Sequence, residues 1–339
     1  MGATGMKGAG AVFGILLAAP ARAVASSQSV LEPGGPQARA LLGLLWLFVV
    51  VCGVVWLLVV AALVVLLLRR RPGDLKPETD TPGQQRGKTV VVGGLVAATA
   101  AILVLFTVAS FAATHIVSPG GAPLLIKVTG QQWWWDVEYE DPDPSKVLET
   151  ANEIHIPTGR PVTFDLQAAD VIHSFWAPSL MGKQDLIPGR DNRLTLVAER
   201  PGVYRGQCAE FCGLQHARMA FVVVAETPAK FEAWRSQQSL PAAAPTDPVR
   251  IRGMQVFLNG ACATCHAIEG TAAGGKTGPD LTHFGSRTGI AAGALANTPA
   301  NLDRWIGDPQ AVKPGANMPQ VPLAAADRGA LVAYLEGLK

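Results

Sequence analysis

The sequence predicts a multi-domain chain in which a hairpin of two membrane-spanning helices precedes an all-β sandwich and a smaller C-terminal domain. Its 339 residues are about twice the ~150 expected of one domain. Hydrophobic residues make up 49% of the chain and charged residues only 16%, and four of the five cysteines stand in two close pairs. Such pairs are typical of a metal or cofactor site. The 28 Lys and Arg nearly balance the 26 Asp and Glu, which argues against a nucleic-acid binder.

Three apolar segments lie at the amino end. Residues 1–25 combine Lys7, a short apolar run and the small residues 23–25, which predicts a signal peptide. The alternative, an uncleaved anchor, has 13 apolar residues where a spanning helix needs about 20. Uncharged runs of 28 residues (Leu41–Leu68) and 26 residues (Thr89–Thr114) predict a transmembrane hairpin within residues 37–122. Two buried core helices are the alternative, and they would not explain the cations that flank the runs.

The distribution of these cations predicts the topology. Residues 26–40 contain only Arg39, whereas the segment between the two apolar runs is rich in basic side chains. They are Arg69, Arg70, Arg71, Lys76, Arg86 and Lys88. The positive-inside rule therefore places the connecting loop in the cytoplasm and everything after Thr114 on the outer face.

Residues 123–235 predict an all-β module. Short apolar segments alternate with Pro, Gly and Asp, and Val162, Phe164 and Leu166 repeat with the period of two that a half-buried strand requires. The length suits an antiparallel sandwich of ~100 residues.

A cluster of soft metal ligands lies near the end of this module. Cys208, Cys212, His216 and Met219 fall within 12 residues, and His173 stands 35 residues before Cys208. Sulfur and imidazole ligands favour copper, zinc or iron–sulfur over calcium or magnesium, and the thioether favours copper. A mononuclear blue-copper site uses one cysteine, so the second is explained only if two coppers share two bridging sulfurs. The alternative is a disulfide between the two cysteines, which would leave the imidazole and the thioether unused.

Residues 236–248 predict a linker, because they are polar and rich in Pro and Ala without a periodic apolar face. The domain that follows, residues 249–339, contains Cys262-Ala-Thr-Cys265-His266. This motif attaches a c-type haem through two thiols and provides a proximal imidazole. A zinc knuckle would need a second Cys or His pair downstream, where the chain offers no Cys and only His283.

Met318 is the candidate for the second axial ligand of this haem, 52 residues after His266. A His/Met pair suits an electron carrier because it leaves no open position for a substrate. An ordinary core methionine is the alternative, but prolines and a glycine around Met318 indicate a loop. The final helix carries an apolar stripe that predicts core packing. It consists of Leu331, Tyr334, Leu335 and Leu338.

Several motifs give the chain a resemblance to a known family. Gln132–Trp135, Asp170–Ser174, Ile187–Arg190 and the Cys208–Met219 loop follow in the order seen in subunit II of haem-copper terminal oxidases. The last 91 residues, with Gly278–Gly285 and Trp305, resemble the class I cytochrome c domain that is fused to this subunit in some members. The resemblance implies a cupredoxin sandwich and an all-α cytochrome domain.

The same resemblance implies roles for individual residues. It assigns a binuclear copper centre, CuA, to His173, Cys208, Cys212, His216, Met219 and the main-chain carbonyl of Glu210. The Glu210 side chain would reach a magnesium ion at the junction with subunit I. Trp133 matches an exposed tryptophan through which electrons enter CuA, although a tryptophan there also suits packing or a membrane interface. Asp170 is either a partner that orients a metal-bound imidazole or a solvated turn residue. His155, His115 and His283 belong to no ligand set.

The implied function is that of the subunit at which electrons enter a haem-copper oxygen reductase of the bacterial cell (inner) membrane. Electrons from an external donor, a cytochrome c or a quinol-oxidising complex, would pass through haem c and CuA to subunit I, where oxygen is reduced to water. Alternatives are the corresponding subunit of a nitric oxide reductase and a copper and haem module without a role in turnover. Residues 124–235 hold 11 basic and 15 acidic residues (net −4) and residues 249–339 hold 8 and 6 (net +2), which favours mutual docking.

Overall fold

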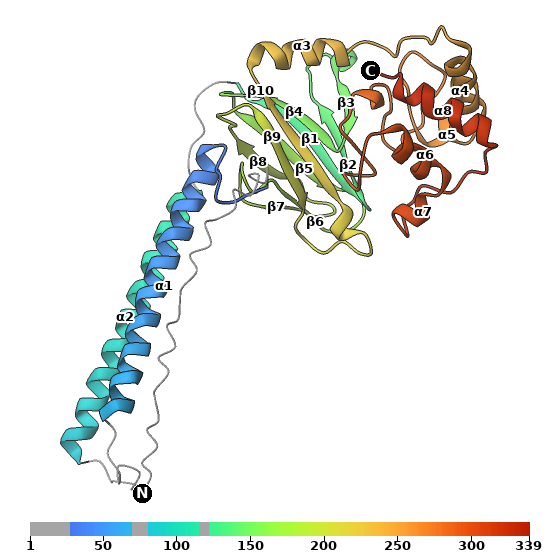
Figure 1. Ribbon diagram of the computed structural model, residues 1–339. Helices are drawn as coiled ribbons and strands as arrows, with labels where there is room; N and C mark the ends of the chain where they lie inside the picture. The colour runs from blue at the N-terminus through green and yellow to red at the C-terminus, as the bar shows by residue number, and fades with distance from the viewer. Residues whose placement is uncertain (1–27, 70–80, 115–121) are drawn as a thin grey trace, which may run out of the picture.

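A computed structural model describes residues 28–69, 81–114 and 122–339. Figure 1 shows three parts in the predicted order: a long helical hairpin, a two-sheet sandwich at its end, and a helical C-terminal domain on the other side of the sandwich. The signal peptide predicted for residues 1–25 lies outside the described residues, as does most of the loop that joins the two long helices.

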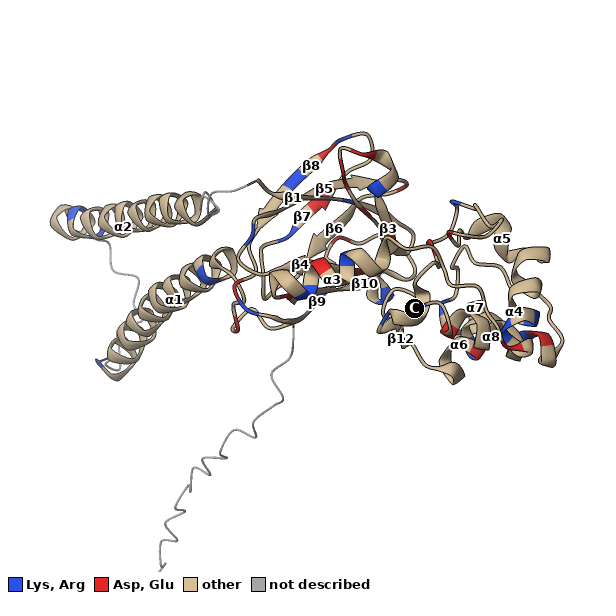
Figure 2. Ribbon diagram, turned by 90° about the horizontal axis from the view of Figure 1, so that it is seen from above, with Lys and Arg blue, Asp and Glu red and all other residues tan. Residues whose placement is uncertain are grey.

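The hairpin consists of α1 (Pro36–Arg69) and α2 (Pro82–Thr114), which lie along each other. Their mean hydropathy values of 3.2 and 2.5 suit membrane spans, and their apolar windows face outward with nothing buried inside the protein. This exposure contradicts the alternative of two core helices. Charged side chains lie towards the ends of the hairpin (Figure 2). Both helices begin before the apolar runs, because proline at the first helical position has a φ that suits a helix start.

A short joint, residues 29–39, attaches α1 to the sandwich. The amide of Gly34 donates to the carbonyl of Ser179 (2.6 Å), and the amide of Glu199 donates back to the carbonyl of Gly34 (2.9 Å). A Cβ at Gly35 would lie 2.2 Å from the carbonyl oxygen of Val197, so only glycine fits this close approach. Arg39 then pairs with Glu199 at 2.5 Å. The first turn of the membrane helix is thereby held directly on the sandwich.

The sandwich has two five-stranded sheets, ordered β3-β2-β1-β5-β8 and β4-β10-β9-β6-β7. Its strands are β1 (Leu124–Gln131), β2 (Trp134–Tyr139), β3 (Leu148–Ala151), β4 (Glu153–Pro157), β5 (Val162–Ala168), β6 (His173–Trp176), β7 (Gln184–Leu186), β8 (Asn192–Leu196), β9 (Gly202–Cys208) and β10 (Ala220–Glu226). Two short 3-10 helices, η1 (Pro144–Lys146) and η2 (His216–Arg218), lie in its loops. Pairing is antiparallel except between β1 and β5 and between β4 and β10. Alternate residues of β5 are buried, as the period of two predicts.

Aromatic rings fill the end of the sandwich core nearest the cysteine loop. Phe175 and Phe221 stack with centroids 4.1 Å apart, and Trp135 meets both edge-on at 5.6 and 5.4 Å. A Cβ at Gly206 would lie 2.1 Å from the Phe221 ring, so a glycine on β9 makes room for this packing. Phe175 belongs to the strand that begins at His173, and Gly206 belongs to the strand that ends at Cys208. The packed rings therefore help to hold the two strands that carry these residues.

A helix closes the first outer module where the sequence predicts only strands and then a linker. α3 (Pro228–Gln238) includes the first three residues of the predicted linker. It packs across the end of the sandwich, where Trp234 stacks on His155 at 4.2 Å and Arg235 pairs with Asp141 at 2.9 Å. The helix follows from Pro228 at its first turn and from Phe231, which is fully buried.

The C-terminal domain is mainly helical. Its elements are α4 (Pro248–Asn259), α5 (Cys262–Cys265), η3 (Phe284–Ser286), β11 (Gly289–Ile290), β12 (Leu295–Ala296), α6 (Pro299–Gly307), α7 (Pro309–Val312) and α8 (Ala325–Glu336). The first and last helices cross closely, because a Cβ at Gly253 would lie 2.0 Å from the carbonyl oxygen of Ala330. The predicted apolar stripe of the last helix, Leu331 to Leu338, is buried in the domain core.

The segment between α3 and α4 does not hang free as a tether. The amide of Ala242 donates to the carbonyl of Glu269 (3.0 Å), and the imidazole Nε2 of His283 pairs with the carbonyl of Leu240 (2.9 Å). The predicted linker thus packs against the cytochrome-like domain in its first half. Asp247 ends it by capping α4, its carboxylate accepting from the amide of Arg250 (2.9 Å).

Candidate metal centre and haem pocket

The predicted metal ligands converge at one end of the sandwich. His173 begins β6, Cys208 ends β9, and Cys212 lies in the loop that returns to β10. One ligand atom from each of these three buried residues lies within 4.8 Å of the other two. Among the described residues, they form the one group of three His, Cys, Asp or Glu side chains that could hold a metal ion.

The two cysteines are free thiols, each with its own imidazole neighbour. Their Sγ atoms lie 3.7 Å apart, far from the ~2.05 Å of a disulfide. Nδ1 of His173 lies 3.9 Å from Sγ of Cys208, and Nδ1 of His216 lies 3.6 Å from Sγ of Cys212. The disulfide alternative is therefore wrong for this structure, and the donors form two similar halves around a pair of sulfurs.

Two further donors complete the cluster. Sδ of Met219 lies 3.8 Å from Sγ of Cys212, and the main-chain carbonyl of Glu210 accepts from the Cys208 thiol at 3.2 Å. The hydrogen bond between the two thiols lowers the pKa of Cys208. Two sulfurs, two imidazoles, a thioether and a carbonyl form a soft donor set that fits copper.

Asp170 orients His173 from the outer side of the cluster. Its Oδ1 lies 2.8 Å from Nε2 of His173, and its Oδ2 accepts from the amide of Gln132 at 2.6 Å. A carboxylate on the outer nitrogen fixes the ring and directs Nδ1 to the metal side. Of the two roles open to Asp170, the geometry supports that of orienting partner.

The Glu210 side chain points to the surface. Its carboxylate pairs with Lys183 at 3.2 Å, and 44% of the side chain is exposed. The main-chain oxygen and the side chain of Glu210 thus face opposite environments: the oxygen lies in the sulfur cluster and the carboxylate lies outside it.

Trp133 is buried, whereas the resemblance predicts an exposed tryptophan. Only 9% of it is exposed. Its indole N–H donates to the main-chain carbonyl of Cys212 at 2.9 Å, and the Gln132 side-chain amide donates to the same oxygen at 2.7 Å. The C-terminal domain covers the ring, since a Cβ at Gly315 would lie 3.5 Å from it. The fused domain is the reason why the expected exposure is absent.

A largely apolar cavity in the C-terminal domain brings the predicted haem residues together. Cys262, Cys265, His266 and Met318 all line it, although Met318 is distant in sequence. The wall includes Phe257, Leu281, Phe284, Leu302, Trp305, Ile306, Leu331 and Leu335. Arg287 also lines the cavity, and its guanidinium donates to the carbonyl of Asp280 at 2.6 Å. An apolar space with two thiols, an imidazole, a thioether and a partly buried cation fits a c-type haem with its carboxylates.

His266 is prepared to act as an iron ligand. Its Nδ1 lies 2.8 Å from the carbonyl oxygen of Pro279, and a carbonyl oxygen can only accept a hydrogen bond. Nδ1 therefore carries the ring proton and leaves Nε2 as the ligand atom. Burial lowers the pKa of His266, which favours the neutral imidazole that a metal requires. A Cβ at Gly278 would lie 2.6 Å from this ring, so glycine is needed beside the ligand.

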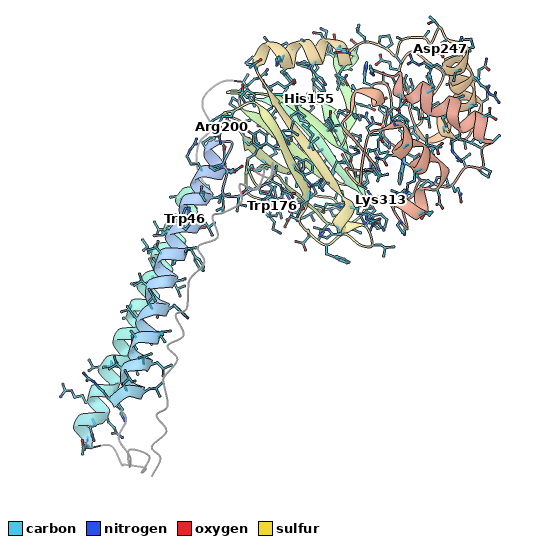
Figure 3. All side chains as sticks on the ribbon, viewed as in Figure 1. Trp46, His155, Trp176, Arg200, Asp247 and Lys313 are labelled. Atoms are coloured by element: carbon cyan, nitrogen blue, oxygen red, sulfur yellow. The ribbon has the colours of Figure 1, made fainter. Side chains whose placement is uncertain are left out.

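The zinc-knuckle alternative lacks the ligands that it needs. His283 lies with its Nε2 on the carbonyl of Leu240 and has no place in the cavity wall. His155, labelled on the sandwich in Figure 3, lies between Glu226 (3.0 Å) and Glu153 (3.3 Å) and belongs neither to the metal cluster nor to the cavity wall. His115 lies outside the described residues.

The metal cluster and the haem pocket face each other across the domain interface. Gln132, Trp133, Trp134 and Asn152 of the sandwich form part of the cavity wall. Trp133 therefore contacts the haem pocket and, through its indole N–H, the Cys212 main chain. The predicted docking of the two domains is seen in the structure, but only one ion pair, Lys276 with Glu149 at 2.5 Å, joins them among the described residues.

Most interdomain hydrogen bonds instead use the main chain, and sequence analysis predicted none of these bonds. Glu153 accepts from the amide and hydroxyl of Thr288, and the amide of Ala220 donates to the carbonyl of Ala292 at 3.0 Å. Lys313 donates to the carbonyl of Trp133 at 2.6 Å. One feature of the sequence could have indicated this contact. Lys313 stands in the Pro/Gly loop that leads to Met318, where a charge is unusual among apolar residues.

Comparisons with known proteins agree with both sites. Residues 124–226 match the family model described as cytochrome c oxidase subunit II, periplasmic domain, and residues 251–339 match the model for cytochrome c. The chain is 37% identical to cytochrome c oxidase subunit 2 of Alkalihalophilus pseudofirmus over 92% of this chain and 91% of that one. It is 34% identical to the Bacillus sp. (strain PS3) protein of the same name over 80% of each.

A solved structure is similar to part of the chain. The periplasmic domain of subunit II of cytochrome oxidase from Bradyrhizobium japonicum is 32% identical, with a TM-score of 0.33, over 36% of this chain and 96% of that chain. The relatives of similar length and the two adjacent family matches define what the chain is. It belongs to the cytochrome c oxidase subunit 2 family, in a form that carries a cytochrome c domain for haem c after the copper-binding domain.

Proposed function

We propose that this chain is the subunit at which electrons enter a haem-copper oxygen reductase, and that it takes them from an external donor and delivers them to subunit I. The observation that carries the proposal is Trp133, whose ring borders the haem pocket while its indole N–H bonds the main chain of Cys212. When bound, haem c and copper supply one-electron redox chemistry. The protein residues hold the two centres on opposite sides of one tryptophan and exclude water from the space between them.

We propose that the copper centre is binuclear. Its ligands would be His173, Cys208, Cys212, His216 and Met219, with the carbonyl of Glu210. The two free thiols and the imidazole beside each of them support this assignment, because a mononuclear blue-copper site uses one cysteine. Cys262 and Cys265 would hold haem c covalently, and His266 and Met318 would be its axial ligands. Magnesium would require the exposed Glu210 carboxylate together with ligands from subunit I.

We further propose that the outer domains face the exterior of the bacterial cell membrane. The six basic residues between the two apolar runs support a cytoplasmic connecting loop. In this arrangement the chain divides into a hairpin (37–122), a copper domain (123–235), a linker (236–248) and a cytochrome domain (249–339). The external donor would deliver electrons to the cytochrome domain, because that domain covers Trp133.

The test is purification of the intact complex from membranes. The proposal expects co-purifying subunit I, consumption of oxygen rather than nitric oxide, and two coppers and one c-type haem per chain in addition to the haem and copper of subunit I. Nitric oxide consumption alone would favour the related reductase, and a complex without turnover would reduce the chain to a copper and haem module.

Trp133→Phe tests the residue that carries the proposal. The substitution keeps an aromatic ring and removes the N–H that bonds Cys212, so electron transfer from haem to copper should slow while both spectra remain. Trp234→Phe is the matched control, because that ring stacks on His155 away from both sites. Equal rates in both variants would contradict the role of Trp133.

A further inference from the structure

Lys313 carries a positive charge into the interface between the two domains. It follows α7 in the loop that leads to Met318, and only 3% of the residue is exposed. Its ammonium donates to the carbonyl of Trp133 at 2.6 Å and to the carbonyl of Ala291 at 3.1 Å. Figure 3 labels it where the sandwich meets the cytochrome domain.

Both acceptors of Lys313 are neutral main-chain oxygens. No carboxylate forms a salt bridge with Lys313 within the described part of the chain. Burial accordingly lowers the pKa of its ammonium to about 7, with Arg218 lowering it further and Cys212 opposing the shift. Burying a cation without a counter-ion is unfavourable in free energy, and the hydrogen bonds of the ammonium offset part of this cost.

The first acceptor, the carbonyl of Trp133, belongs to the residue between the two sites. The main chain of Trp133 is bound by Lys313, and its side chain is bound to the Cys212 carbonyl. The position of the indole ring is thus set from one end by the cytochrome domain and from the other by the copper loop. A movement of Lys313 would change the position of the ring relative to both.

The second acceptor lies in a turn that also contacts the copper loop. Ala291, Ala292 and Gly293 have φ values of 51°, 57° and 73°, in the left-handed region that is unfavourable for alanine. The carbonyl of Ala292 accepts from the amide of Ala220, the residue after Met219. A conformation that is unfavourable in isolation persists here because Lys313 and Ala220 hold it from two sides.

Neighbours of Lys313 lie along the same contact. The Gln215 side chain donates to the carbonyl of Pro314 at 2.7 Å, and the guanidinium of Arg218 donates to the carbonyl of Val312. Asn317 donates to the carbonyl of Gln132 at 3.3 Å. The loop that ends at Met318 therefore lies against the copper loop, and Lys313 forms the buried contact.

We propose that Lys313 is a positioning residue for electron transfer between the two sites: it fastens the Met318 loop and the Ala291–Gly293 turn to the main chain of Trp133. This inference rests on the proposed function. The ammonium sets the separation of the haem pocket and the copper loop, and transfer rates fall steeply as such a separation grows.

Lys313→Met in the intact complex tests the proposal, because it keeps the length and apolar stem of the side chain and removes the donor. After photoreduction of the haem, electron transfer to copper should slow about tenfold, as expected when a charge-assisted hydrogen bond that holds a docked state is lost. Both visible spectra and the metal content should be unchanged. Lys313→Arg, which restores donors to both carbonyls, should recover part of the rate.

Lys276→Met is the matched control. Lys276 also belongs to the cytochrome domain and bonds the sandwich, but its side chain is 70% exposed. Exposed ion pairs contribute little, so this variant should transfer electrons at the wild-type rate. Equal rates in Lys313→Met and Lys276→Met would overturn the proposal. An absence of haem-to-copper transfer in the wild type would instead overturn the proposed function.

A measurement on the unmodified complex needs no substitution. Treatment with acetic anhydride, followed by peptide mass spectrometry, should acetylate Lys276 and Lys339 and leave Lys313 protected. Acetylation of Lys313 as complete as that of Lys276 would show that the buried contact does not persist in solution, and the proposal would fail even if Lys313→Met cannot be produced with its haem.

Discussion

The indole N–H of Trp133 donates a hydrogen bond to the main-chain carbonyl of Cys212 over 2.9 Å. The contact is permitted by glycine on both sides: a Cβ at Gly213 would lie 3.2 Å from the Trp133 ring, and one at Gly315 would lie 3.5 Å from it. One of these glycines belongs to the copper loop and the other to the loop before Met318. The residue expected to meet a soluble donor is therefore enclosed by the cytochrome domain of the same chain.

Cys208→Ser should abolish the proposed binuclear copper site and leave haem c in place. A hydroxyl is a poor substitute for a soft bridging ligand, and Cys208 contacts Cys212, His173 and the carbonyl of Glu210 at once. Metal analysis and the near-infrared spectrum of the purified complex provide the measurement. Two coppers per chain with an unchanged spectrum would rule out a bridging role for this thiol.

Gly130→Ala should disturb the copper site through a ligand rather than by removing one. The new Cβ would lie 2.9 Å from Cδ2 of His173, and that ring cannot turn away freely because Asp170 holds its Nε2. We expect copper to remain bound with an altered visible spectrum. Gly202→Ala is the control in the same domain, since its Cβ would meet only ordinary contacts at 3.6 Å. Identical spectra in the two variants would contradict the expectation.

Met318→Ala should keep the haem covalently bound and lower its midpoint potential. Attachment depends on Cys262 and Cys265, whereas the axial thioether raises the potential. A decrease on the order of 100 mV is expected, a fraction of the ~0.8 V that axial ligands can span. Redox titration of the haem band gives the value. An unchanged midpoint would mean that another residue ligates the iron.

Removal of the cytochrome domain after Gln238, where α3 ends, should leave a copper subunit that still assembles. The cut exposes Trp133 to added cytochrome. Full turnover is expected at high donor concentration and a loss of activity at low concentration, because a tethered domain acts at an effective concentration on the order of millimolar. Equal activity at every donor concentration would show that electrons need not pass through the haem domain. Loss of copper would show that the two domains are not independent.

Asp136→Asn should stabilise the protein above pH 6. Burial, with Glu149 and Glu138 nearby, raises the pKa of Asp136 to about 6, above the ordinary value of an aspartate. The folded state thus binds the proton more tightly, so the stability of the wild type falls as pH rises from about 4 to about 6 and stays lower above. The variant lacks this loss, which is worth about 1–3 kcal/mol.

Thermal unfolding of the complex at pH 4 and pH 8 measures the effect of this substitution. The gain in midpoint temperature should be seen at pH 8 and be small at pH 4. Asp143→Asn provides a contrast of opposite sign, because hydrogen bonds from Ser145 lower the pKa of Asp143. A gain of the same size for Asp136→Asn at both pH values would exclude the ionisation of Asp136 as its cause.

The features that could be predicted from the sequence depend on side-chain type and on spacing along the chain. The hairpin follows from uncharged runs, and the ligands from Cys208 to Met219 lie within one loop. The individual contacts between the two outer domains could not be predicted. They are formed by Lys313, Gln215 and Arg218 with main-chain carbonyls, which every residue possesses. The helix α3 was missed because only Phe231 and Gln238 are buried, too few for a periodic pattern. The burial of Trp133 depends on a domain more than a hundred residues away.

The joint at residues 29–39 has a consequence for how the molecule stands on its membrane. Arg39, already inside the first membrane helix, is paired with Glu199 of the sandwich, and the Gly34 main chain is bonded to two loops of that domain. The copper domain is therefore joined to the first membrane helix by main-chain hydrogen bonds and an ion pair, and not by a free linker. We expect these contacts to fix the height and tilt of the copper domain above the lipid, and with them the distance from the sulfur cluster to the membrane surface.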